Sequence, residues 1–330
     1  MDLTIIWAGI LAFAVFAYVV MDGFDLGIGI LFPFLSPGKE RDNAMNSVAP
    51  VWDGNETWLV LGGGGLFAAF PLAYAVMMPA LYAPLMMMLL GLVFRGIAFE
   101  YRWRIELNRW LWDIAFAGGS LLAALSQGIM LGAILQGISV SGRHYAGGNW
   151  DWLSPFSLLT GISVVVGYAL LGATWLIMKT EDELLQHAFR LAKFLGWCLL
   201  AAIVAVSIAT PFLNNIYYKH WFAWPSVLLS AQVPLLVAIA AFLFFRSLRE
   251  KHESAPFLIA LCLFGISFIG LCISIFPYVV PNQITIWQAA APESSQIFML
   301  IGTGVLIPMI LAYTGHAYWV FRGKVGEGYH

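Results

Sequence analysis

The chain has 330 residues, of which 61% are hydrophobic and only 10% are Asp, Glu, Lys or Arg, with a mean hydropathy of +0.84. Ordinary soluble domains carry about 25% charged residues, because their outer shell must be polar. The composition excludes a soluble enzyme, a secreted disulfide scaffold and a disordered chain, and the net charge of −2 offers no basic field for nucleic acid. What remains is an all-α polytopic membrane protein embedded in a lipid bilayer.

Nine apolar stretches are long enough to cross a bilayer, which needs about 20 mostly apolar residues per helix. The first follows Asp2 and no basic residue, so it lacks the charged start of a cleavable signal peptide. We expect residues 1–330 to form a single integral membrane domain, with two four-helix bundles at 4–138 and 155–277 and a ninth, peripheral helix at 294–321. In chain order the stretches are 4–32, 56–75, 78–99, 112–138, 155–178, 189–212, 222–246, 255–277 and 294–321.

Basic residues are distributed unevenly over the loops between these stretches. One side carries 14 of the 16 Lys and Arg residues, including Arg95, which we assign to the loop after the third stretch. The other side carries only Arg143 and Lys219. Because Lys and Arg are retained in cytoplasmic loops, we expect the N-terminus outside and the C-terminal His330 in the cytoplasm.

Four acidic residues of the first two stretches are the main candidates for chemistry at membrane depth. Asp22 and Asp25 lie inside the first stretch, three residues apart and therefore on one helix face. Asp53 and Glu56 lie at the start of the second stretch. Ionisable groups in a membrane are costly and mark proton or cation paths. The alternatives are that Asp22 and Asp25 only hydrogen-bond a neighbouring helix, and that Asp53 caps its own helix.

Histidine pairs that could ligate haem iron are missing from the nine stretches. Only His316 lies within a stretch, whereas a bis-His haem needs two ligands at matched depth. Copper and zinc sites also need several ligands. We therefore expect this chain to ligate no metal or haem by itself.

Other polar or small residues have simpler interpretations. The run Gly62–Gly65 lacks a following GK[ST] sequence, so it predicts a helix-packing surface and not a nucleotide loop. Asp113 is expected to cap a helix, and Gln127 and Gln136 to hydrogen-bond a partner or a quinone head group. We expect an interfacial cluster of locally paired charges from Glu100, Arg102, Arg104 and Glu106.

Six motifs, spread from the first stretch to the ninth, carry a resemblance to a known family. They are MDGFDLGIG at 21–29, NSVAPVWDGNETW at 46–58, FRGIAFEYR at 94–102, LLGATWLIMKT at 170–180, FPYVVP at 276–281 and PMILAYTGHAYWVFRGKV at 308–325. Together they resemble subunit II of the cytochrome bd-type quinol oxidases, and the first two motifs form a specific pair. The short chain resembles the cyanide-insensitive branch of that family.

The resemblance implies a bacterial plasma-membrane terminal oxidase that oxidises quinol and reduces dioxygen to water without pumping protons. In that family subunit I binds two haems b and one haem d, and subunit II is its nine-helix partner, which is not catalytic alone. Some members hold a structural quinone in subunit II. A small single-helix accessory subunit is a further possible partner that the resemblance implies.

The resemblance also implies roles for individual residues. A cytoplasmic proton path falls on Asp53 at its mouth and on Asp25 and Asp22 at greater depth, and an oxygen route falls near Trp58. Glu56 stands where some members have Gln, which adds a titratable group near the mouth.

Two other classes of protein share these features. A secondary transporter or ion channel also has intramembrane carboxylates and glycine-interrupted spans. A scaffold with inert acids is the third possibility. The odd number of stretches without a clear inverted repeat argues against the transporter.

Overall fold

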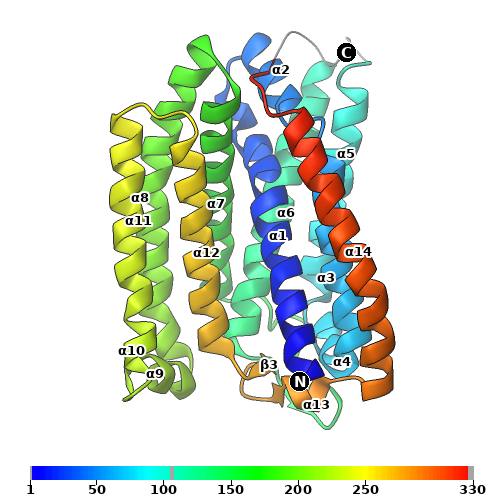
Figure 1. The fold of residues 1–330 in the computed structure, drawn as a ribbon. Helices are drawn as coiled ribbons and strands as arrows, with labels where there is room; N and C mark the ends of the chain where they lie inside the picture. Colours follow the sequence, from blue (N-terminus) through cyan, green and yellow to red (C-terminus); the bar gives the residue numbers. More distant parts are fainter. Residues whose placement is uncertain (1, 105–107, 326–330) are drawn as a thin grey trace.

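The helices of the protein run alongside one another in a single tall bundle (Figure 1). The structure is a computed structural model that describes residues 2–104 and 108–325, so the expected cytoplasmic position of His330 lies outside the described residues. The end of the bundle that carries the short helix α2 (Lys39–Asn46) is called the α2 end below. The opposite end, with α13 (Ile286–Ala289), is called the α13 end.

Eight helices within the described residues are long and apolar enough to cross a membrane, in agreement with the predicted all-α multi-pass fold. They are α1 (Leu3–Leu31), α5 (Tyr82–Tyr101), α6 (Arg109–Gln136), α7 (Pro155–Lys179), α8 (Asp182–Leu213), α11 (Gln232–Arg249), α12 (Ala255–Ile275) and α14 (Glu293–Val320).

The remaining expected stretch, 56–75, is divided between two helices. α3 (Trp52–Ala69) runs beside α1 but is less apolar than the eight spans, because its first two turns are polar. The helix breaks at Phe70, and α4 (Pro71–Ala80) begins with a proline, which fits the first turn of a helix because its missing N–H is not needed there.

The other elements are short and lie between the long helices. They are the 3₁₀ turn η1 (Phe32–Phe34), α9 (Asn215–Phe222), α10 (Val227–Ser230), and two antiparallel hairpins. The expected stretch 222–246 is therefore shared among the end of α9, α10 and α11. The hairpins are β1 (Val140–Ser141) with β2 (His144–Tyr145), where Val140 pairs with Tyr145, and β3 (Tyr278–Val280) with β4 (Ile284–Thr285), where Tyr278 pairs with Thr285.

Asp2 fixes the start of α1. Its carboxylate accepts a hydrogen bond from the backbone N–H of Thr4 at 2.9 Å, as expected of an N-cap. It also accepts one from Nε1 of Trp287 in α13 at 2.7 Å, and this bond, the largest influence, lowers the pKa of Asp2. The N-terminus of α1 is thus tied to α13.

Glycines bring α1 and α7 into close backbone contact. A Cβ atom added at Gly172 would lie 2.5 Å from the backbone of Gly27, and one added at Gly27 would overlap the backbone of α7. Small residues allow such approaches between membrane helices. The contact buries the DGFDLG segment of α1, so that Asp22 and Asp25 are both 0% exposed.

The helices form two groups that share contacts through α7. α1, α3, α5 and α6 pack together, and α7, α8, α11 and α12 pack together, while α7 contacts both α1 and α6. α14 lies outside these groups against α1 and α3 and is largely exposed (Figure 1).

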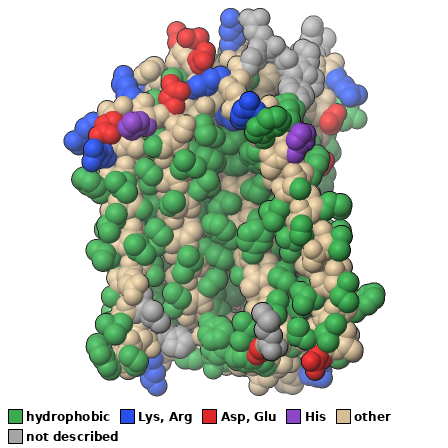
Figure 2. Space-filling view, viewed as in Figure 1, with side chains coloured by type: hydrophobic (Ala, Val, Ile, Leu, Met, Phe, Trp, Pro, Cys, Tyr) green, Lys and Arg blue, Asp and Glu red, His purple; other side chains and the backbone are tan. Residues whose placement is uncertain are grey.

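On the face shown in Figure 2, charged side chains gather at the α2 end of the molecule, and hydrophobic side chains cover the bundle below it. The assignment of Arg95 to a loop is wrong, because Arg95 lies inside α5 and is 0% exposed. The other Arg residues of that segment, Arg102, Arg104 and Arg109, do lie at the α2 end, so the uneven distribution of basic residues persists.

Candidate functional site

Arg95 is the centre of a buried charged cluster that joins α1, α3 and α5. Its Nη1 atom donates to Oδ1 of Asp22 at 2.5 Å, and its Nη2 atom donates to Oε1 of Glu56. The side chains of Arg95 and Asp22 are fully buried, and that of Glu56 is 29% exposed. Sequence reasoning missed Arg95, although a basic residue within an apolar stretch is itself a signal for an intramembrane functional group.

Aromatic rings hold the guanidinium group of Arg95 in place. The Cζ atom lies 5.8 Å from the ring centroid of Trp52, within the range of a cation–π contact. The Trp52 ring in turn stacks on Phe99, with centroids 4.8 Å apart and planes 5° apart. The cation is therefore held by the Trp52 ring, which Phe99 supports, and by the carboxylates of Asp22 and Glu56.

Asp25 forms a second arm of the cluster through Asn55. Nδ2 of Asn55 donates to Oδ2 of Asp25 at 2.7 Å and to the backbone carbonyl of Met21 at 3.3 Å. The hydroxyl of Tyr318, from α14, donates to Oδ1 of Asn55 at 3.0 Å. The sequence analysis did not assign Tyr318 to the site, although the residue lies in the motif at 308–325, because its long separation from Asn55 along the chain gives no local signal of the contact.

The cluster holds more carboxylates than cations. Asp22 and Glu56 pair with Arg95, while Asp25 bonds to Asn55, so full ionisation of the three acids would leave two negative charges without a counter-ion in a mostly buried site. Oδ2 of Asp22 and Oδ1 of Asp25 also have no hydrogen-bond partner among the described residues. Since an unpaired buried charge is very costly, the binding of a proton is the available way to balance such a site.

Asp53 lies outside this cluster. It is exposed in the first turn of α3, and the N-cap of α3 is Val51 without a side-chain hydrogen bond. The alternative that Asp53 caps the helix is therefore wrong. A small cavity lies between the start of α3 and α14, with a volume of about 10 Å³, about the space that one water molecule needs. It is lined among others by Pro50, Gly54, Asn55 and Tyr318 and so reaches the partner of Asp25.

Trp58 lies five residues, about one and a half turns, beyond Asp53 in α3 and is 1% exposed. Its ring packs edge-on against Phe13 of α1 with centroids 5.5 Å apart, beside the small residues Ala14 and Ala17. Its Nε1 atom has no hydrogen-bond partner among the described residues. The structure therefore places Trp58 in an apolar contact between α1 and α3.

The glutamines considered for a quinone head group have partners within the chain. Gln127 bonds to the hydroxyls of Tyr18 and Tyr168 at 2.8 and 2.6 Å, and Oε1 of Gln136 accepts from Ser154 Oγ at 2.5 Å. These amides thus serve contacts among α1, α6 and α7.

A second charged network lies at the α2 end. Arg102 is 2% exposed and bonds to Asp113 at 2.6 Å and to Asp42 at 2.9 Å. The expectation that Arg102 pairs with a neighbouring residue in the sequence is therefore wrong. The expectation that Asp113 caps α6 is also wrong, because the N-cap is Asn108. Arg41 bonds to Asp113, and Arg109 to Asp42. Only the exposed pair Arg104–Glu100, at 3.5 Å, follows the local pattern, and Glu106 lies outside the described residues.

Comparisons with known proteins identify the class of molecule to which this bundle belongs. Residues 3–321 match the family model of cytochrome bd terminal oxidase subunit II. The chain is 29% identical to cytochrome bd-I ubiquinol oxidase subunit 2 of Escherichia coli K12, over 98% of this chain and 95% of that protein. It is 25% identical to cytochrome bd ubiquinol oxidase subunit 2 of Bacillus subtilis, over 98% and 96% of the two chains.

A solved structure shares the fold. A chain of the bd oxidase from Geobacillus thermodenitrificans superposes with a TM-score of 0.73, covering 97% of this chain and 99% of that one at 17% identity. The chain belongs to the cytochrome bd terminal oxidase subunit II family. It is a multi-pass inner-membrane protein and a subunit of an oxidoreductase, and the alternative of a transporter is not supported.

Proposed function

We propose that this chain carries protons from the cytoplasm toward a haem-bearing subunit I, within a complex that oxidises quinol and reduces dioxygen. Two haems b and one haem d in subunit I supply the electron transfer and oxygen reduction. The excess of carboxylates around the buried Arg95 is the observation that supports this proposal.

The proposed direction of proton uptake follows from the charge distribution. Basic residues gather at the α2 end, which the positive-inside rule assigns to the cytoplasm, so that the N-terminus lies outside. Reduction of one dioxygen consumes four protons. If these come from the cytoplasm while quinol releases its own outside, charge is separated across the membrane without a pump.

The proposed proton path uses the residues in order of depth from the α2 end. Asp53 is the exposed group, and the cavity beside Gly54 leads to Asn55, which bonds to Asp25. Glu56 and Asp22 share Arg95. Arg95 stabilises the carboxylates that have released a proton, and the uncompensated carboxylate is the group that binds the next one.

The proposed oxygen route passes Trp58. The ring lies among the apolar side chains Phe13, Ala14 and Ala17, a setting suited to a small apolar molecule and unsuited to protons. Glu56 and Trp58 are two residues apart and therefore lie on different faces of α3, which separates the proposed oxygen route from the Glu56–Arg95 pair.

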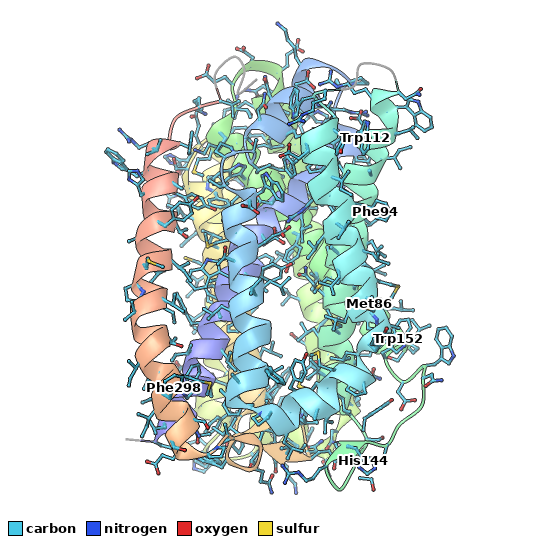
Figure 3. The ribbon with its side chains drawn as sticks, turned by 90° about the vertical axis from the view of Figure 1, so that its right-hand side faces the viewer. Met86, Phe94, Trp112, His144, Trp152 and Phe298 are labelled. Carbon is cyan, nitrogen blue, oxygen red and sulfur yellow. The ribbon has the colours of Figure 1, made fainter. Side chains whose placement is uncertain are left out.

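We place subunit I on the face formed by α14, α3 and α5, where Phe298 and Phe94 lie on either side of α3 (Figure 3). Glu56, Val60, Gly64 and Phe67 recur at helical spacing along α3, and all are at least partly exposed. A carboxylate facing lipid is costly, so a protein partner and not lipid is expected over Glu56.

The glycine run provides a test of this face. A Cβ atom added at Gly63 or Gly64 would have no neighbouring atom within 4 Å, so nothing in the chain itself opposes a larger residue. Gly64→Leu should leave the chain in the membrane but abolish co-purification of haem. Gly118→Leu on α6, which has equally open space, is the control and should retain haem. Retention of haem by both variants would contradict this placement of subunit I.

The proton path is tested with Asp25→Asn and Asp53→Asn, which keep the shape of the side chain but remove the ionisable group. Turnover per haem d should fall, since a relay group contributes about 10²–10⁴-fold to a rate. Asp182→Asn, an exposed acid at the start of α8, is a matched control that should leave turnover unchanged. Asp22→Asn is not a suitable control, because it removes the counter-ion of Arg95.

Measuring turnover per haem d, and not per cell, separates chemistry from assembly. If the acids only hold helices together, the variants should lose about 0.6–2 kcal/mol of stability while each assembled complex keeps its turnover. Wild-type turnover per haem d in both variants would refute the proton path.

A further inference from the structure

Three polar side chains cross the middle of the bundle next to Asp22, and the proposed proton path does not use them. The hydroxyl of Tyr168 in α7 donates to Oε1 of Gln127 in α6 at 2.6 Å. Nε2 of Gln127 donates to the hydroxyl of Tyr18 in α1 at 2.8 Å. Tyr18 and Tyr168 are 5% and 1% exposed, and Tyr18 lies one helical turn before Asp22.

The hydrogen bonds among Tyr168, Gln127 and Tyr18 leave the hydroxyl proton of Tyr18 without an acceptor. The oxygen of Tyr18 accepts from Gln127, so its own proton needs another acceptor. Oδ2 of Asp22 is buried without a hydrogen-bond partner among the described residues, and Asp22 follows Tyr18 by one turn of α1 and interacts with it electrostatically. A reversed Gln127 amide would leave the Tyr168 hydroxyl without its acceptor, so the observed orientation satisfies more groups.

Packing holds Tyr168, the member of this hydrogen-bonded series farthest from Asp22, in place. The ring of Tyr168 lies against Gly23, where an added Cβ atom would be 2.9 Å from its Cε1 atom. The other side of the ring faces Phe264, with centroids 6.2 Å apart. The hydroxyl of Tyr168 therefore has a fixed position, and through Gln127 it also fixes the hydroxyl of Tyr18.

We propose that Tyr18 is a positioning residue for Asp22: its hydroxyl, held by Gln127 and Tyr168, donates to Oδ2 of Asp22. Asp22 then receives a charge-assisted hydrogen bond on each oxygen, one from Arg95 and one from Tyr18. Asp22 therefore stays ionised as the permanent counter-ion of Arg95 and does not itself carry protons along the proposed path, whose exchangeable protons bind to the other carboxylates. The ionisable groups around Asp22 are Tyr18 and Asp25 on α1, Glu56 on α3, Arg95 on α5, Tyr168 on α7 and Tyr318 on α14.

This inference rests on the proposed proton path and is tested with Tyr18→Phe in the purified complex of the chain with its haem-bearing subunit. Without the hydroxyl, Asp22 binds a proton more readily and competes with Asp25. A hydrogen bond to a charged group changes such an affinity by roughly tenfold. The pH at which turnover per haem d is half-maximal on the alkaline side should therefore rise by about one pH unit.

Two further variants distinguish positioning from packing. Tyr168→Phe removes only the distal donor, so the same shift should appear with a smaller size, and this variant carries the test if Tyr18→Phe does not assemble. Tyr217→Phe is the matched control, because Tyr217 is 1% exposed and its hydroxyl donates at 2.8 Å to the Leu135 carbonyl, away from the cluster. It should leave the pH dependence unchanged.

The outcomes separate this inference from the function on which it rests. A wild-type pH dependence in the Tyr18 and Tyr168 variants, with slowed turnover in Asp25→Asn, would overturn the positioning role alone. A loss that is equal at every pH and matches that of Tyr217→Phe would indicate packing and overturn it as well. Wild-type turnover in both Asp25→Asn and Asp53→Asn would instead remove the proton path itself.

Discussion

The chain holds two groups of arginine and carboxylate side chains, one at membrane depth and one at the α2 end, and their compositions are opposite. Among the described residues, the first group holds one arginine, Arg95, and three carboxylates: Asp22 and Glu56 pair with Arg95, and Asp25 bonds to Asn55. In the second group two carboxylates serve three arginines, and its members are Arg41, Arg102, Arg109, Asp42 and Asp113.

The difference shows how the location of a charged group determines what it can do. The α2-end group lies close to water, where an excess positive charge is solvated, so it can join α2 to α6 and to the end of α5 without binding protons. The buried group has no solvent to balance its excess carboxylates, so protons must do so. One network therefore stabilises the fold, and the other is suited to proton transfer.

Arg95→Leu should have the largest effect of any single change in either group. It leaves Asp22 fully buried without its cation, and breaking such a pair costs about 3–5 kcal/mol. We expect little assembled complex, measured as haem d per amount of chain in isolated membranes. The exposed Arg104→Leu is the control and should assemble normally. The double variant Asp22→Leu/Arg95→Leu should recover assembly without recovering turnover.

Arg102→Gln should have an intermediate effect on stability and none on turnover. It removes the bonds of a nearly buried cation to Asp42 and Asp113, which each keep one other arginine, so the expected cost is about 1–3 kcal/mol. Thermal unfolding of the purified complex measures this loss. A fall in turnover per haem d would contradict the separation of the two groups.

Glu56→Gln should lower turnover and leave stability nearly unchanged, which is the reverse of the effect expected for Arg102→Gln. The amide can still accept a hydrogen bond from Arg95, and Asp22 remains its counter-ion, so stability should change by less than about 1 kcal/mol. Because one exchangeable carboxylate is lost, turnover per haem d should fall. Unchanged turnover together with an unchanged pH dependence would exclude Glu56 from the proton path.

Glu40→Gln should have the smallest effect. Burial raises the pKa of Glu40, but hydrogen bonds from the Ser36 N–H and from His187 outweigh it and lower the pKa below the ordinary value of 4.5. Its stabilising contribution is thus present above pH 4.5 and is lost as the pH falls through the lowered pKa. After allowance for solvent screening it is worth about 0–1 kcal/mol at pH 7. Denaturation of the variant at pH 7 and at acidic pH checks this, with the difference disappearing in acid.

Several features of the fold were predictable because they depend on local composition. Apolar stretches locate the long helices, since each membrane span must satisfy its own backbone hydrogen bonds. The bounds of α3 and α4 were less predictable. The polar start of α3 and the run Gly62–Gly65 lower the hydropathy of α3, so hydropathy alone locates this helix less sharply than the eight long spans. The spacing of Asp22 and Asp25 correctly placed both acids on the buried part of α1.

Hydropathy and spacing are properties of each segment alone, so they were enough to predict a multi-pass helical membrane protein with acids at membrane depth. Which of these groups meet depends on how the helices pack. Arg95 could be taken for a loop residue until α5 was placed beside α1 and α3, and Tyr318 reaches Asn55 across 263 positions of sequence. The charge balance of a buried site is the sum of contributions from separate helices, so it exists only once those helices have packed together.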